Sequence, residues 1–141
     1  MSPVWWESSE VERYVVGAVI ACDGRALLLR RKPDDFLGDL WELPSGRVEG
    51  EETLEQTLER EIAEETGLRV TSIERPLGTF DYRSGSGKAT RQVTFEVRVE
   101  PGQVELSEHN EHAWLGVDEL EGLYMSDETR EVLASALRGG V

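Results

Sequence analysis

The 141-residue chain lacks several features that would each point to a particular class of protein. It has no hydrophobic run long enough to cross a membrane, and its first residues lack the charged and apolar regions of a signal peptide. Its only cysteine, Cys22, excludes a framework of internal disulfide bonds. We therefore expect a cytoplasmic protein in which Cys22 is a small buried residue at the end of a strand.

Positive charge is also scarce. The chain carries 29 Asp and Glu against 15 Lys and Arg, which gives a net charge of −14 at pH 7. So acidic a surface argues against general binding of nucleic acids or of anionic membranes. It would also repel a phosphorylated substrate, which would then need a bound metal ion to reverse the sign of the charge locally.

Apolar runs and turn residues predict a single domain over residues 1–141, without repeats, low-complexity segments or a linker. Residues 1–10, with Trp5 and Trp6, are expected to be a loosely held terminal or edge segment. Strands are expected at 14–21, 25–31, 69–82, 88–100 and 113–115, with an extended piece at 41–44. Helices are expected at 52–66, ending at Gly67, and from 126 onward, with a helical turn at 117–120. The remaining connections, 33–40 and the acidic segment 103–113, are expected to be loops.

The first helix places acidic residues on an unusual face. At about 100° per residue, one apolar stripe is formed by Leu54, Leu58 and Ile62. Glu65 falls within this stripe, Glu61 lies at its edge, and Glu64 lies further round on the same side. A solvated acidic helix would instead carry its carboxylates opposite the stripe. Because inward carboxylates are costly unless a cation or an arginine compensates them, the pattern favours a binding site over a solvated face.

The residues around this helix also have a recognisable spacing. It resembles the Nudix box, G-x5-E-x7-R-E-U-x-E-E-x-G-U, in which U is a bulky aliphatic residue. Every fixed position is filled, by Gly46, Glu52, Arg60, Glu61, Ile62, Glu64, Glu65, Gly67 and Leu68. Seven of these positions demand one named residue, so at roughly 5–10% usage each a chance match has a probability of about 10⁻⁸.

The resemblance implies the α/β/α sandwich with a mixed β-sheet that is typical of the Nudix family; periodicity alone indicates only an α+β or α/β protein. It implies Glu61 and Glu65 as the main ligands of Mg²⁺ or Mn²⁺, with Glu64 as a frequent third. The main-chain carbonyl of Ser45 is the expected additional ligand, although the family more often has Gly-Gly where this chain has Ser-Gly. The expected structural supports of the site are Gly46, Gly67 and an ion pair between Arg60 and Glu52.

The implied reaction is hydrolysis of a nucleoside diphosphate linked to another moiety, with water attacking the pyrophosphate. The proton acceptor in this family comes from the box or from a later acidic loop. In the segment 103–113 the candidates are Glu108 and Glu111, and Glu111 is favoured because Trp114 would anchor the loop nearby. His109 and His112 are expected to have surface or structural roles.

Several residues outside the box are candidates for binding the substrate. Positive charge for the phosphates is expected from Arg30, Arg31, Lys32 or Arg47. Arg30 and Arg31 point to opposite faces of a regular strand, so only one of them can face the cleft. Phe80 and Tyr82 share one strand face and would line either the base pocket or the core.

The substrate class is read from residues downstream of the box. A proline of some ADP-ribose enzymes is absent from the segment 82–84, and Gly85 stands where dinucleoside polyphosphate enzymes have a tyrosine. These absences favour a small nucleotide such as a nucleoside triphosphate, and a homodimer is left open. The main alternative is a non-catalytic Nudix-fold domain that binds nucleotides in regulation. A related isomerase would rely on a catalytic cysteine, and a purely acidic partner-binding protein would need no inward carboxylates.

Overall fold

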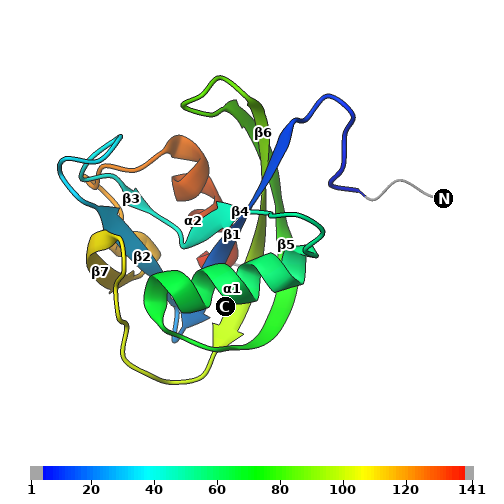
Figure 1. Ribbon diagram of the computed structural model, residues 1–141. Helices are drawn as coiled ribbons and strands as arrows, with labels where there is room; N and C mark the ends of the chain where they lie inside the picture. Colours follow the sequence, from blue (N-terminus) through cyan, green and yellow to red (C-terminus); the bar gives the residue numbers. More distant parts are fainter. Residues whose placement is uncertain (1–4, 139–141) are drawn as a thin grey trace.

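The computed structural model describes residues 5–138 and places them in a mixed seven-stranded sheet with a helix on each face (Figure 1). The main strand order is β3-β2-β1-β6-β5, with β4 also paired to β1 and β7 paired to β2. The strands are β1 Arg13–Cys22, β2 Arg25–Arg31, β3 Trp41–Glu42, β4 Ser45–Arg47, β5 Val70–Arg83, β6 Ala89–Val99 and β7 His109–Leu115. The helices are α1 Leu54–Thr66, the 3-10 turn η1 Val117–Glu119 and α2 Asp127–Arg138. This is the expected α/β/α sandwich.

Strand β1 lies at the centre of the sheet. It pairs in parallel with β6, from Arg13 opposite Thr90 to Ile20 opposite Val97, and antiparallel with β2 and β4. Five consecutive residues of β1, 16–20, are buried, as expected of a strand covered on both faces. Alternate residues face two separate cores, the first under α1 and the second under α2. β1 therefore links both halves of the sandwich.

The segment around α1 is held by local capping. Thr53 Oγ1 accepts a hydrogen bond from Gln56 N–H (3.1 Å), and Gln56 Oε1 accepts one from Thr53 N–H (2.9 Å). Gly67 closes the helix with a left-handed φ of 73°. The helix thus starts two residues later than the predicted Glu52, because Thr53 forms a capping box. Glu52 is left outside the helix.

Strand β7 is longer than predicted. Its pairing with β2 runs from Ala26 opposite Leu115 to Arg31 opposite His109, so the expected acidic loop ends at residue 108 instead of 113. Acidic and polar residues join this strand because the free edge of β2 supplies their backbone hydrogen-bond partners. The expected position of Glu111 in a loop is therefore wrong.

Two further expectations concern single residues near the ends of β1. Cys22 does end the strand, but its side chain is exposed, so the expected burial is wrong. Trp6 packs edge-on against Tyr14 with ring centroids 5.1 Å apart, and its carbonyl accepts a hydrogen bond from Arg91 (3.1 Å). The segment carrying Trp6 is thus tied to the sheet, while the side chain of Trp5 is exposed. Within residues 5–138, no helix is both long and apolar enough to span a membrane.

Removing the N-cap side chain of α1 tests the importance of this local capping. Thr53→Ala should lower the free energy of unfolding by about 1 kcal/mol, because the backbone N–H of Gln56 loses its acceptor. Urea denaturation with an unchanged slope would measure the difference. Ser9→Ala removes an exposed hydroxyl that makes no hydrogen bond in residues 5–138 and serves as the control. Equal urea midpoints for Thr53→Ala and Ser9→Ala would show that the N-cap does not contribute to stability as proposed.

Candidate active site

The second half of α1 lies against β4, and one glycine allows their close approach. A Cβ atom built on Gly46 would overlap the carboxyl group of Glu61, so no larger residue fits there without moving that side chain. Glu61 is only 14% exposed. Gly46 is therefore the residue that lets a carboxylate of the helix rest directly on the strand.

Glu65 stands one turn further along the same helix. Its Oε1 accepts a hydrogen bond from the main-chain N–H of Ser45 at 3.2 Å. Burial raises the pKa of Glu65 to about 9, the Ser45 hydrogen bond opposes this shift, and the charge of the adjacent Glu61 adds to it. Ser45 has no positive φ, so a residue other than glycine is accommodated here. Two carboxylates are thus held together with little water, an arrangement that favours either a shared proton or a cation.

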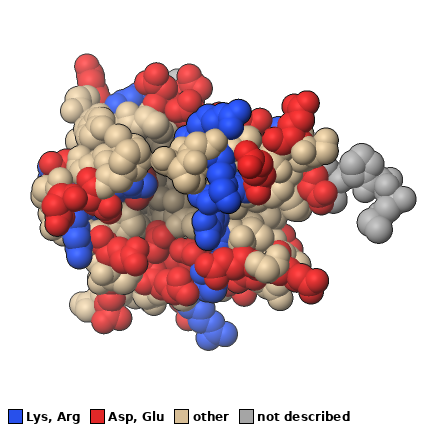
Figure 2. Space-filling view, turned by 45° about the horizontal axis from the view of Figure 1, so that its top comes forward, with Lys and Arg blue, Asp and Glu red and all other residues tan. Residues whose placement is uncertain are grey.

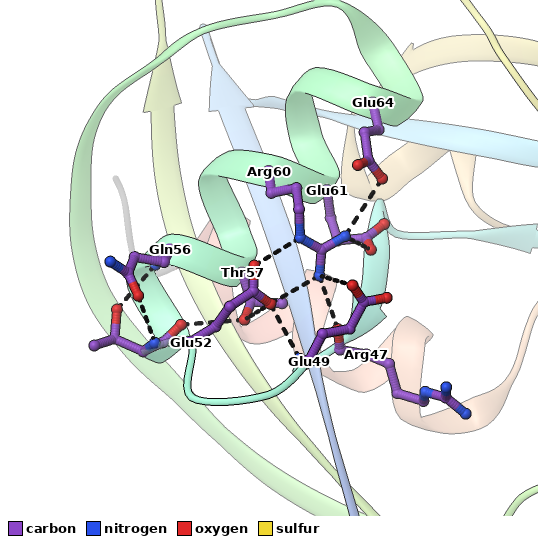
Figure 3. A network of polar contacts seen from close by, with 9 residues as sticks. Arg47, Glu49, Glu52, Gln56, Thr57, Arg60, Glu61 and Glu64 are labelled. Carbon is purple, nitrogen blue, oxygen red and sulfur yellow. Dashed lines mark hydrogen bonds and ion pairs between the residues drawn. The ribbon is translucent and has the colours of Figure 1, made fainter.

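Arg60 joins the helix to the loop before it (Figure 3). Its guanidinium donates to both carboxylate oxygens of Glu52, at 2.7 and 2.9 Å, and to Glu61 Oε1 at 2.6 Å. It also donates to the main-chain oxygen of Arg47 at 3.0 Å. The Arg60 hydrogen bonds lower the pKa of Glu52 to about 2, so this carboxylate stays ionised. The expected Arg60–Glu52 ion pair is present, and it orients Glu61 as well.

Glu64 is the most exposed of the three box carboxylates. Its side chain is 59% exposed and lies 3.4 Å from Arg60 Nη1. Within residues 5–138, no three His, Cys, Asp or Glu side chains stand close enough to hold a metal ion as they are oriented. Glu61 and Glu65 together still fit a hard divalent cation, because they are buried oxygen donors of like charge. Glu64 would need another rotamer to join them.

A cavity of about 280 Å³ opens beside this carboxylate pair and reaches α2. Ser45 and Arg31 line it from the sheet, and Phe80 and Tyr82 line it with ring centroids 5.9 Å apart. Its remaining polar walls come from Glu42, Gln92, Ser126, Glu128 and Thr129. An apolar wall with a few polar groups is typical of a small-molecule site. The two aromatic residues therefore lie where a base could stack.

The structure separates the two adjacent arginines at the end of β2. Arg31 lines the cavity, whereas Arg30 Nη1 donates to Glu111 Oε1 at 3.0 Å and stacks over the ring of Trp41. Of the two arginines, only Arg31 lines this cavity, which agrees with the expectation that they point to opposite faces. Glu111 thus forms an ion pair with Arg30 on the neighbouring strand β2. Glu108 is exposed in the bend before β7. Within residues 5–138 neither one bonds to a box carboxylate.

One contact beside the cavity, between His109 and Glu42, was not predicted from the sequence. His109 Nε2 donates to Glu42 Oε2 at 2.8 Å, and Arg31 Nε lies 3.1 Å from the same oxygen. The side chain of His109 is 9% exposed and its Nδ1 has no hydrogen-bond partner within residues 5–138, so of the two expected roles, surface or structural, its burial agrees with the structural one. Glu42 and His109 are 67 residues apart. Only the pairing of β7 with β2 brings these two residues together, and no local sequence pattern predicts this contact.

The comparisons with known proteins agree with this geometry. The NUDIX domain family matches residues 11–136. The chain belongs to the Nudix family. It is 32% identical over 105 residues to the CTP pyrophosphohydrolase of Escherichia coli, covering 74% of this chain and 76% of that protein. It is 38% identical over 111 residues to a MutT-like protein of Streptomyces ambofaciens, covering 75% and 64% of the two chains. The crystal structure of the MutT protein from Methanosarcina mazei superposes with a TM-score of 0.79 at 25% identity, covering 95% of this chain and 99% of that one.

The raised pKa of Glu65 has a consequence for stability in buffer without divalent cations. The folded protein holds this proton more tightly than the unfolded chain, so the resulting stability is complete below about pH 4 and is lost as the pH rises toward 9. Glu65→Gln cannot ionise and should be about 2 kcal/mol more stable than wild type at pH 8.5, but similar at pH 4.5. Urea denaturation at both pH values measures this. Glu59→Gln, on the exposed side of α1, is the control, and parallel pH profiles for all three proteins would refute the assignment.

Proposed function

We propose that this Nudix enzyme hydrolyses a nucleoside triphosphate or a related nucleotide in a reaction that depends on a divalent metal ion. The observation that carries the proposal is the buried pair of carboxylates, Glu61 and Glu65, beside a cavity lined by aromatic residues. Such a pair is unfavourable in an apo protein and becomes useful once a cation neutralises it. The cavity beside it supplies room for the nucleoside.

Glu61, Glu65 and the carbonyl of Ser45 would hold Mg²⁺ or Mn²⁺, with Glu64 added after a rotation. The bound metal would neutralise charge on the phosphates and lower the pKa of the attacking water. Arg60 and Glu52 keep Glu61 in place, and the Ser45 N–H keeps Glu65 in place. These supports limit the movement of the two carboxylates, which positioning of a diphosphate requires.

We place the proton acceptor among the carboxylates of the box. The sequence favours Glu111 only if it lies in a loop near Trp114. In β7 it is instead 49% exposed, and its carboxylate accepts a hydrogen bond from Arg30 and makes none to a residue of the box. Glu111 could reach water beside Glu61 and Glu65 only if strand β7 moved. The box carboxylates already lie next to that position, so they can accept a proton without such a movement.

The cavity and the relatives support the proposed substrate class. Phe80 and Tyr82 offer faces for a nucleobase, and Ser126 and Glu128 offer polar groups to its edge. The similarity to a CTP pyrophosphohydrolase supports a nucleoside triphosphate as the first substrate to try. The non-catalytic alternative is disfavoured because every glutamate of the box is present.

Metal dependence and the role of the carboxylate pair can be tested together. Turnover of a panel of nucleoside triphosphates should disappear with EDTA and return with Mg²⁺ or Mn²⁺. Glu65→Gln should lower kcat by about 10²- to 10³-fold, because one charged ligand is lost. Glu59→Gln on the opposite side of α1 should keep the wild-type rate. Full turnover in EDTA, or a normal kcat for Glu65→Gln, would disprove the proposal.

The proton acceptor is tested by comparing Glu111→Gln with Glu61→Gln. Glu111→Gln should change kcat by less than about threefold, since its loss removes only an exposed ion pair with Arg30. Glu61→Gln should lower kcat by about 10²-fold or more. Steady-state rates across pH 6–9 would check both. A large loss of kcat in Glu111→Gln, with a flattened acid limb of the pH profile, would show that Glu111 in β7 is the proton acceptor.

A further inference from the structure

A second cavity, of about 500 Å³, opens at the other end of β4. Three basic residues from three different strands or turns line it: Arg13 at the start of β1, Arg47 at the end of β4, and Lys88 in the β5–β6 turn. Figure 2 shows that basic side chains on this face gather in a strip bordered by carboxylates. On a chain with a net charge of −14, such a concentration of cations is unexpected. We call the cavity lined by Arg13, Arg47 and Lys88 the basic groove.

The cations of the basic groove form no ion pair with the part of the chain that the structure describes. Within residues 5–138, no carboxylate lies within 4.0 Å of any of these three side chains, and none of the three donates a hydrogen bond. Figure 3 shows the guanidinium of Arg47 turned away from the Arg60 network.

The two acidic residues that line the groove are already engaged elsewhere. Glu12 accepts a hydrogen bond from Ala89 N–H at 3.0 Å, and Glu49 lies 3.8 Å from Arg60 Nη2. A single unpaired exposed cation is ordinary, because water solvates it well. Three unpaired cations against two carboxylates still leave the lining of this cavity with a net positive charge, which attracts an anion.

The two cavities lie at opposite ends of strand β4, and the carboxylate pair lies between them. Ser45 lines the nucleotide cavity and holds Glu65, Gly46 lies under Glu61, and Arg47 lines the basic groove. At a strand rise of about 3.3 Å per residue, the span from Ser45 to Arg47 is about 7 Å. A linear substrate that crosses the carboxylate pair therefore has its nucleoside at one end and its other end in the basic groove.

We propose that the basic groove binds the terminal phosphates of a nucleoside triphosphate, with Arg13 and Lys88 as residues that determine specificity. This inference rests on the proposed function. The three cations match the charge of the β- and γ-phosphates, which the reaction releases as pyrophosphate. ADP-ribose would place a neutral sugar at this end, and a dinucleotide would place a second nucleoside there. Neither of these substrates would use three unpaired cations.

The first test compares two substrates of the same enzyme. Arg13→Gln and Lys88→Gln should each lower kcat/KM for the preferred nucleoside triphosphate by about tenfold, through KM, and change kcat/KM for ADP-ribose by less than about twofold. Rising salt should raise KM for the triphosphate more in wild type than in either variant. Arg69→Gln, at an 82% exposed cation beyond α1, is the charge-matched control. Variants indistinguishable from Arg69→Gln, or equal losses on both substrates, would overturn the proposal.

The second test does not depend on turnover. Titration calorimetry with inorganic tripolyphosphate in metal-free buffer should show binding to wild type, and about tenfold weaker binding to Arg13→Gln and to Lys88→Gln. If wild type hydrolyses no nucleotide but this pattern holds, the proposed function fails while the anion site remains. If wild type hydrolyses triphosphates and all variants bind tripolyphosphate alike, the function remains and the groove is refuted.

Discussion

The close approach of α1 to β4 is the constraint on which the rest of the site depends. It requires a residue without a side chain at Gly46, since Glu61 fills the space that a Cβ would occupy. Arg60 then spans helix, loop and strand through Glu52, Glu61 and the carbonyl of Arg47. Bidentate contact by a planar guanidinium holds these parts in one orientation, which a lysine could not do. The position of every other functional group is defined relative to this junction.

The electrostatics of the protein follow from the same junction. Two carboxylates are kept together with little water, which destabilises the protein unless a proton or a cation joins them. The net charge of −14 would repel an anionic substrate. The groove lined by Arg13, Arg47 and Lys88 lies at one end of β4, and Arg31 lines the cavity at the other. Negative charge is thus concentrated where a metal would bind, and positive charge on both sides of it. Sites that trade stability for function commonly hold such local conflicts.

Local patterns were sufficient for much of the interpretation. The apolar stripe of α1, its C-cap at Gly67 and the inward position of Glu61 and Glu65 depend on residues a few positions apart, so helical geometry determines them. The β5 and β6 strands were predicted to within about one residue at each end. The helix α1 was predicted to start at Glu52 but starts at Leu54, because Thr53 forms the N-cap. Burial of Cys22 was predicted wrongly, because its position at the end of a strand does not indicate which residues pack over it.

The amino-acid sequence by itself determined the family, the box helix and the residues that support it, because this information lies within one short, continuous segment. Only the tertiary structure decided that Glu111 lies in β7 bonded to Arg30, that His109 meets Glu42, and that Arg31 rather than Arg30 faces the cavity. It also brought three distant cations around one groove. These arrangements depend on strand pairing between segments far apart in the chain. Such pairing is selected by hydrogen bonding and burial across the whole sheet, so no local pattern encodes it.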